Sequence, residues 1–407
     1  MSTLAFKEFM ESGKARRRLL GALGLVHGRP GVTRAELGAE LGLSKVGVKN
    51  NVEELLGLGF VREGEPLPSA NGRRPVPLRL EPGLFHVLGA YVRPGRLALR
   101  LEDAAGEPLE ELGLGRPSED AAETVATLAK LAGDVLAKYG VAPGKVLGLG
   151  LCLPGILDVK GGVAVSSPAV KLDRNYPFAA KLEAATGLRC HLANDADLLA
   201  VAEKRWGKAK DMKSFLYLTC GYGLGMFINN QLYSGHQGNA GEVGYMQLNE
   251  GGPRDIDGRA GTLYSIAPFY QIVTIVEGII KRGGESKVRD FLPEGGGKVD
   301  FEMVLQAIEA GDGLCAQLVA ERFEQIGRAV LNLAYLFNPE AIFLDDWTAR
   351  CPGISLDIVR RMLGHYGAHN WRLSTQALPA SQGRGALPRA AATLPFTRLF
   401  QQANQIT

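Results

Sequence analysis

Cysteines are few in this sequence, and none is placed to cooperate with another. The chain has five of them: Cys152, Cys190, Cys220, Cys315 and Cys351. None belongs to a C-x-x-C pair, so neither a disulfide framework nor a zinc ribbon is indicated. We expect buried thiols in a reducing compartment.

Long apolar runs are also missing. The first ten residues include Lys7 and Glu8 and lack the apolar core of a signal peptide. No apolar run approaches the ~20 residues that a membrane-spanning helix needs. The sequence therefore predicts a cytoplasmic protein that has no membrane partner.

The chain has little net charge, but the charge is unevenly distributed. With 407 residues the chain is long enough for two or three domains, and its formal charge is +3. Residues 1–80 hold 13 Lys and Arg against 8 Asp and Glu, a net charge of +5. This N-terminal excess is where we expect a nucleic-acid partner to bind.

Capping signals divide the first 57 residues into helices. Apolar residues recur at helical spacing over 11–27 and predict a first helix there. Thr33 is a good N-cap for a second helix, and Glu36 completes a capping box with it. Gly42 breaks this helix, and Ser44 caps a third one over 45–56.

The third helix combines a buried stripe with an exposed basic start. In a helix-turn-helix, the second helix of the motif presents its N-terminal residues to base edges. The two caps could instead serve only their helices. The candidate DNA contacts of this motif are Thr33, Arg34, Ser44, Lys45, Lys49 and Asn50.

Two short strands around a basic loop follow. The strands are expected over 60–62 and 78–80, and the loop between them ends with Arg73 and Arg74. These strands form a wing whose arginines could contact phosphates or enter the minor groove. The sequence therefore predicts a winged helix-turn-helix that binds double-stranded DNA; a protein-interaction module is the alternative.

The longer C-terminal part begins with three strands, a helix and a fourth strand. A similar start recurs later in the chain, which indicates a duplicated, two-lobed architecture. The first strands are expected over 86–92, 97–101, 110–114 and 146–153, with the helix over 119–138. The recurring strands are expected over 215–219 and 221–228, and a long helix over 314–337 precedes a late strand over 341–344.

An ordered set of short motifs resembles the repressor branch of the ROK family (repressors, open reading frames, kinases). The motifs are Leu43-Ser44-Lys45, Gly72-Arg73-Arg74-Pro75, Leu153-Pro154-Gly155, Asn194-Asp195-Ala196-Asp197, Gly221–Gly225, Gly241-Glu242-Val243-Gly244 and Asn338-Pro339. The resemblance covers essentially the whole chain. It implies an α/β fold, with a winged helix-turn-helix joined to a two-lobed, actin-like (ribonuclease H-like) sugar-kinase fold.

The resemblance also implies domain boundaries. We expect the DNA-binding domain over 1–82 and the effector and oligomerisation domain over 83–407. Within the latter, lobe I is expected over 83–198 plus 384–407, and lobe II over 199–383.

The kinase motifs of the family are altered in this chain. Tyr91 stands where the kinases have Asp, Pro94 stands in a glycine-rich phosphate turn, and Tyr222 replaces a Thr in a second phosphate loop. Proline has no N–H to donate to phosphate. Asp345 and Asp346 replace paired glycines near the nucleotide. We therefore predict no enzymatic activity, no catalytic residue and no cofactor.

The zinc motif of the family is altered as well. Tyr245 takes the place of the His ligand, and every cysteine is missing from the segment 255–262. A tetrahedral site of sulfur and nitrogen ligands cannot form from these residues, so we predict no zinc. Asp255 and Asp257 are expected to form salt bridges with Arg254 or Arg259 rather than to hold a hard cation.

Part of the sugar pocket of the family is retained. The resemblance implies that Asn194, Asp195 and Glu242 hydrogen-bond sugar hydroxyls and that Gly155 lines the cleft. Tyr245 and Tyr264 stand where a His and a Glu are usual. The tyrosines could stack on a sugar or fill an empty pocket, and Asn194 and Asp195 could simply cap a helix.

These observations predict a homodimeric or homotetrameric transcriptional regulator, in first place a repressor, that responds to a sugar or a sugar derivative. One alternative is a DNA-binding regulator without an effector, in which the cleft is vestigial. The other, which the altered phosphate loops disfavour, is a sugar kinase with a fused DNA-binding head.

Overall fold

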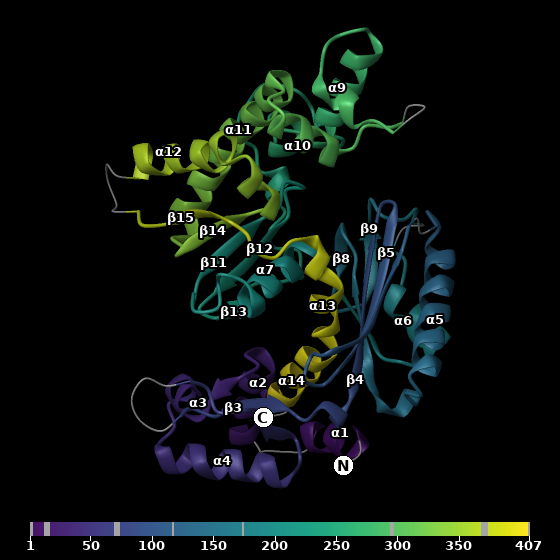
Figure 1. Cartoon of the computed structure of the whole chain (residues 1–407), viewed down its shortest axis with the longest axis vertical. Coiled ribbons are helices and arrows are strands. Elements are labelled where there is room, and N and C mark those ends of the chain that lie inside the picture. Colours follow the sequence, from purple (N-terminus) through teal and green to yellow (C-terminus); the bar gives the residue numbers. More distant parts are fainter. Residues whose placement is uncertain are drawn as a thin grey trace. The chain divides into compact units, whose positions relative to one another are not determined.

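The chain divides into two compact units. The computed structural model describes residues 3–11, 17–68, 74–115, 118–172, 175–293, 297–367 and 373–405. Unit 1 consists of Met1–Leu198 and Gly385–Thr407, and unit 2 consists of Leu199–Arg384 (Figure 1). The separate DNA-binding domain expected over 1–82 lies inside unit 1 and stays a prediction.

Unit 1 begins with four helices: α1 (Thr3–Glu11), α2 (Arg17–Gly28), α3 (Arg34–Leu41) and α4 (Lys45–Gly57). The first helix expected from the sequence, over 11–27, is observed from Arg17 onwards. We did not expect α1. It forms because Phe6, Phe9 and Met10 lie on one face, and Phe6 packs edge-on against Phe60 with ring centroids 5.2 Å apart.

The predicted caps are present. The Thr33 hydroxyl accepts from the N–H of Glu36, and the Glu36 carboxylate accepts from the N–H of Thr33. Gly42 ends α3 in the left-handed region with φ 62°, and Ser44 Oγ accepts from the N–H of Gly47 at 3.1 Å. The predicted helix-turn-helix is confirmed at the level of local structure.

The wing strands are also present, and a third strand joins them. β2 (Val61–Glu63) and β1 (Val32–Thr33) both pair antiparallel with β3 (Pro77–Leu80), in the order β1-β3-β2. The two-residue strand β1 was not expected. Its pairing ties the start of α3 to the wing, because Thr33 is both a strand residue and the cap of that helix.

The main sheet of unit 1 has the order β10-β7-β4-β5-β6. β4 (His86–Arg93), β5 (Arg96–Asp103) and β6 (Pro108–Leu114) are antiparallel, whereas β7 (Val146–Cys152) and β10 (Cys190–Ala193) run parallel to β4. The predicted order of three strands, a helix and a fourth strand is confirmed. A small hairpin, β8 (Ile156–Asp158) and β9 (Val163–Ser166), follows β7.

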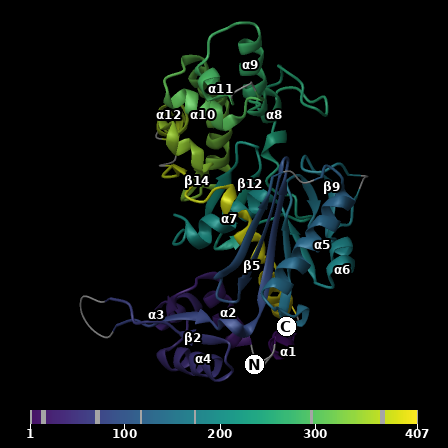
Figure 2. The same cartoon turned by 45° about the vertical axis from the view of Figure 1, so that its right-hand side comes forward.

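Helices cover both faces of this sheet. α5 (Ala121–Lys138) and α6 (Phe178–Thr186) lie on one face, and α13 (Leu387–Ala392) and α14 (Leu394–Gln405) lie on the other (Figures 1 and 2). The approach of α13 requires glycine in the strands. A Cβ at Gly150 would lie 1.9 Å from the carbonyl oxygen of Ala391.

Unit 2 has a second five-stranded sheet with the order β13-β12-β11-β14-β15. Its strands are β11 (Phe215–Leu218), β12 (Leu224–Ile228), β13 (Gln231–Leu232), β14 (Ala341–Leu344) and β15 (Gln376–Pro379). Its longest helix, α11 (Gly313–Phe337), packs against α12 (Leu356–Gly367) and α10 (Phe301–Glu309). The predicted strands at 215–219 and 341–344 and the long helix are confirmed. α7 (Asp195–Trp206) contains the boundary between the units.

One apolar stretch comes closer to the length of a membrane span than we expected. Residues 263–281, 19 in number, have a mean hydropathy of 1.5. This stretch is split into α8 (Leu263–Ile266) and α9 (Tyr270–Lys281), with Pro268 between them. Ile272 and Val276 of α9 are buried in the core of unit 2, so we interpret the stretch as core helices.

Candidate functional site

The start of α4 presents a basic, exposed face. Val48 and Val52 fix the helix in the core, while Lys45, Lys49 and Asn50 are exposed. Lys49 Nζ lies 3.8 Å from Glu53 Oε1. Such an exposed ion pair contributes little free energy, so the Lys49 ammonium can contact a phosphate instead. The helix therefore offers side-chain donors at the end that, in a helix-turn-helix, enters the major groove.

Val46 is a residue that we did not single out from the sequence. Its side chain is 67% exposed, and it lies on the first turn of α4 between Lys45 and the capped Gly47. An exposed apolar side chain at this place can contact the methyl group of thymine. The sequence alone could have indicated that Val46 is exposed, because this residue falls outside the stripe of buried apolar residues of α4.

The remaining predicted DNA contacts differ in their surroundings. Thr33 is buried and its hydroxyl hydrogen-bonds Glu36, so Thr33 caps α3, and its contact with DNA stays a prediction. Arg34 pairs with Glu63 of the wing at 2.8 Å. Arg74 is exposed at the end of the loop between β2 and β3. Arg73 lies outside the described residues.

Three of the predicted effector residues come together in unit 1. Asn194 lies at the start of α7, where its Oδ1 accepts from the N–H of Ala196 at 2.9 Å. Its Nδ2 donates to the carbonyl oxygen of Gly155 at 2.8 Å. Asp195 Oδ1 also accepts from the N–H of Ala196, at 3.0 Å. Asn194 thus caps the helix and holds Gly155, which has a φ of 117° that favours glycine.

The other three predicted effector residues lie in unit 2, where aromatic rings form a row. The ring of Tyr264 packs edge-on against Tyr245 at 5.1 Å and against Tyr222 at 5.4 Å between centroids. Burial, with the nearby charges of Asp257 and Glu242, raises the pKa of Tyr245. Glu242 therefore lies close enough to Tyr245 to interact with it electrostatically. That all six residues form one pocket stays a prediction.

A buried carboxylate accepts a hydrogen bond from a backbone N–H in the loop after β11. Asp345 Oδ2 accepts from the N–H of Cys220 at 2.8 Å, although Asp345 is only 5% exposed. Burial raises the pKa of Asp345, and the positive charge of Arg384 opposes this rise. Tyr222, two residues after Cys220, is buried and has a φ of 65°. The N–H of Cys220, next to the segment that resembles a phosphate loop, thus already donates to Asp345 rather than to a phosphate.

The turn between β4 and β5 is a tight hairpin. Arg93 and Arg96 are paired, which leaves only Pro94 and Gly95 as the connecting residues. Tyr91 is buried in β4. A two-residue hairpin with proline offers few N–H groups for a phosphate.

Arg259 forms ion pairs within the segment 255–262, which corresponds to the zinc motif of the family. Its guanidinium contacts Asp257 Oδ2 at 2.5 Å and Asp255 Oδ2 at 3.3 Å, which confirms the predicted salt bridges. The same guanidinium lies 4.1 Å from the ring centroid of Tyr245. Within the described part of the chain, no group of three or more His, Cys, Asp or Glu residues could hold a metal ion.

Comparisons with known proteins agree on one family. The ROK family model matches residues 95–393. The xylose repressor of Caldicellulosiruptor bescii is 27% identical over 338 residues, covering 82% of this chain and 83% of that protein. The beta-glucoside kinase of Klebsiella pneumoniae is 31% identical over 222 residues, which cover 54% of this chain and 70% of the kinase.

A solved structure extends the likeness to the N-terminal helices. The crystal structure of a ROK family transcriptional regulator, a homolog of the E. coli MLC protein, has a TM-score of 0.74 and 20% identity. It covers 95% of this chain and 97% of its own, and thus shows the same fold over both units. Since the family model spans more than half of the chain, this protein belongs to the ROK family.

Proposed function

We propose that this protein is a DNA-binding transcriptional repressor of the ROK family that controls genes of sugar metabolism. The observation that carries this proposal is the exposed start of α4, where Lys45, Lys49 and Asn50 lie beside a wing. The xylose repressor and the MLC-like regulator, each similar over most of its length, support it. A regulator of this kind acts on the chromosome, so we place it in the cytoplasm.

We propose further that the kinase-like body has no kinase activity. The N–H of Cys220 donates to the buried Asp345, and Pro94 removes one N–H donor from the two-residue turn between β4 and β5. Phosphoryl transfer depends on amides that hold the phosphates, so both changes remove parts of the reaction site. The similarity to the beta-glucoside kinase makes a direct test necessary: we expect no sugar-dependent ATP consumption in a coupled assay.

The effector is, in this proposal, a sugar or a sugar derivative, and its candidate contacts are Asn194 and Asp195 in unit 1 and Glu242 in unit 2. Carboxylate and amide oxygens suit a polyol, and the rings of Tyr245 and Tyr264 suit its apolar face. The relatives named for xylose and beta-glucosides favour this class of ligand. A regulator without an effector is the second candidate. It is favoured by Tyr264, whose hydroxyl donates a hydrogen bond to the carbonyl of Gly221, so that its ring takes up room that a sugar would need.

We also propose a homodimer or homotetramer. One winged helix contacts one half-site, so a specific operator is bound by a pair of heads. Unit 2 exposes an apolar patch that a second copy could cover. Its members are Tyr335, Leu336, Phe337 and Tyr366, at the ends of α11 and α12. Light scattering of the wild type and of Leu336→Glu tests this assembly, since the variant should shift it towards monomers.

The decisive experiment measures binding of labelled genomic fragments from around this gene. We expect binding that resists non-specific competitor and weakens steeply between 50 and 200 mM salt, on the order of a hundredfold or more. Lys49→Ala should weaken it, whereas the matched variant Lys181→Ala, on α6, should not. A loss of DNA affinity with xylose or a beta-glucoside identifies the effector class.

Each other outcome has a definite meaning. Specific binding that no sugar changes favours the regulator without effector. Sugar-dependent ATP consumption would contradict the non-enzymatic part of the proposal. Absence of specific DNA binding would contradict the proposed function as a whole.

A further inference from the structure

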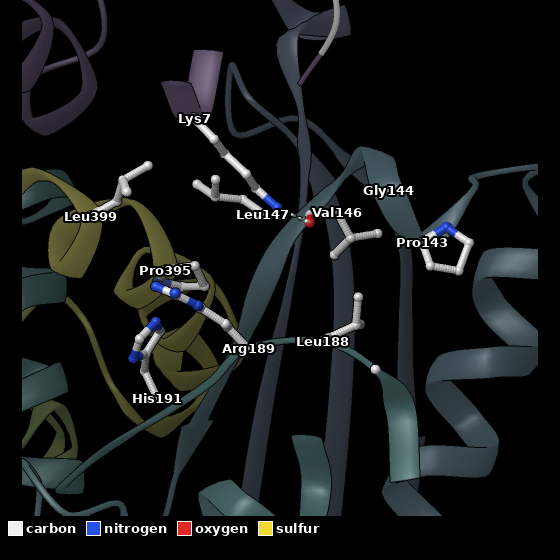
Figure 3. A pocket seen from close by; sticks show the side chains of 11 residues that line it. Lys7, Pro143, Gly144, Val146, Leu147, Leu188, Arg189, His191, Pro395 and Leu399 are labelled. Atoms are coloured by element: carbon white, nitrogen blue, oxygen red, sulfur yellow. Dashed lines mark hydrogen bonds between the residues drawn. The ribbon is translucent and has the colours of Figure 1, made fainter. Parts of the chain in front are cut away.

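Unit 1 contains a pocket of about 320 Å³ away from the predicted effector residues. Its lining comes from α1, from the segment before and within β10, from β7 and from α14 (Figure 3). Val146, Leu188 and Pro395 form apolar walls. The pocket therefore joins the first helix of the chain to one edge of the main sheet.

The polar groups of this pocket are all basic. Lys7 of α1, Arg189 before β10 and His191 of β10 line it, and no Asp or Glu does. The Lys7 ammonium donates to the carbonyl oxygen of Val146 at 3.4 Å (Figure 3). Among the described residues, Arg189 forms no ion pair and no side-chain hydrogen bond. Such a cluster attracts an anion.

The positive charge of the cluster comes from Lys7 and Arg189, because the surroundings of His191 keep its imidazole neutral at pH 7. Burial, together with the positive charges of Arg398 and Arg189, lowers the pKa of His191 to about 4, against the opposing effect of Glu183. Arg398 belongs to α14 and Glu183 to α6. The Glu183 carboxylate is engaged by the N–H of Cys190 at 2.9 Å and does not line the pocket.

We propose that this pocket binds a small organic phosphate monoester. The charge of the phosphate matches Arg189 and Lys7, and the imidazole of His191 can donate or accept a hydrogen bond at the same place. The volume and the apolar walls suit a compact organic group attached to the phosphate. An occupant would link α1 to β10, and thus the N-terminal helices to the sheet of unit 1.

Calorimetric titration of the full chain with phenyl phosphate tests this site. We expect saturable binding of phenyl phosphate, weaker binding of inorganic phosphate, which cannot use the apolar walls, and no measurable binding of phenol. Arg189→Gln should weaken phenyl phosphate roughly ten- to a hundredfold, because a charge-assisted contact is lost. Lys181→Gln removes the same charge from an exposed site on α6 and should leave the affinity unchanged.

Three results would overturn the proposal. They are the absence of saturable binding to the wild type, equal weakening by Arg189→Gln and Lys181→Gln, and equal affinities for phenyl phosphate and phenol. Lys7→Gln is a second variant for the same comparison, and thermal unfolding without ligand shows that each variant is folded. Competition with duplex DNA separates the two sources of phosphate: mutually exclusive binding would assign the pocket to the DNA backbone and contradict a metabolite site.

Discussion

The imidazole of His27 stacks on the phenyl ring of Phe396, with centroids 3.8 Å apart and planes 25° apart. His27 belongs to α2, which packs against the helix-turn-helix, and Phe396 belongs to α14 near the end of the chain. The contact between these helices is close, because a Cβ at Gly24 would lie 2.4 Å from the ring of Phe400. The C-terminal helix is thus part of the core of the N-terminal helices.

Truncation of Phe396 should therefore destabilise the N-terminal helices. Phe396 is buried against Phe6 and Phe85, so Phe396→Ala removes a large core side chain and should lower the free energy of unfolding by about 3–5 kcal/mol. Denaturant unfolding measures this loss. Tyr233→Ala, at an aromatic ring of unit 2 that is 49% exposed, is the control and should cost far less. Equal losses would show that α14 is not a core element.

Removal of the charge at Lys49 should reduce DNA affinity without reducing stability. Its pair with Glu53 is exposed, and such pairs contribute about 0–1 kcal/mol. If Lys49 contacts a phosphate, Lys49→Ala should reduce the slope of log affinity against log salt by about one. Anisotropy titrations at four salt concentrations give this slope. An unchanged slope would remove Lys49 from the set of phosphate contacts.

Replacement of Val46 should change the preference for bases rather than the salt dependence. A contact of the valine with a thymine methyl group is lost in Val46→Ser, and discrimination at that base pair should fall by about 1–3 kcal/mol. Competition between operators that carry thymine or uracil at each position measures it. A variant that loses affinity equally for all sequences would contradict a base contact.

Arg259 should keep the segment 255–262 ordered. Arg259→Gln removes its ion pairs with Asp255 and Asp257 and its contact with the Tyr245 ring. We expect faster amide hydrogen exchange in this segment, with little change in the core strands of unit 2. Arg254→Gln, whose guanidinium contacts only the carbonyl of Gly258 among the described residues, is the matched variant and should have the smaller effect. Unchanged exchange in Arg259→Gln would refute this role.

Stability should fall as the pH decreases from about 6.5 to about 4, in part because of His191. Burial lowers the pKa of this side chain to about 4 in the folded protein, whereas the unfolded chain has a value near 6.5. The unfolded state therefore binds more protons in this interval, and His191 accounts for a loss of about 3 kcal/mol. His191→Gln should flatten the curve of unfolding free energy against pH. Parallel curves for variant and wild type would contradict it.

Local signals explain why the helix-turn-helix could be predicted. Thr33, Glu36 and Ser44 act within four residues of their partners, so the sequence contains the whole interaction. The helix α1 was missed because its stability comes from distant partners such as Phe60 and Phe85. The helices α13 and α14 were not anticipated for the same reason.

The same distinction applies to the candidate site. The salt bridges of Arg259 are local and were expected. The hydrogen bond between Asp345 and Cys220 joins residues 125 positions apart, and only the fold reveals it. The basic pocket combines Lys7 with Arg189 and His191, which no pattern along the chain connects.

The discontinuity of unit 1 has a consequence for the order of events during synthesis. The core that contains Phe6 and Leu23 also contains Phe396 and Leu399, which are translated after all of unit 2. While the ribosome is still elongating unit 2, the N-terminal helices lack this part of their core, and the strand surfaces at Gly89 and Gly150 are uncovered. A nascent chain therefore cannot complete the core of its N-terminal helices before unit 2 has been translated, and the proposed operator binding would wait until the rest of the protein exists.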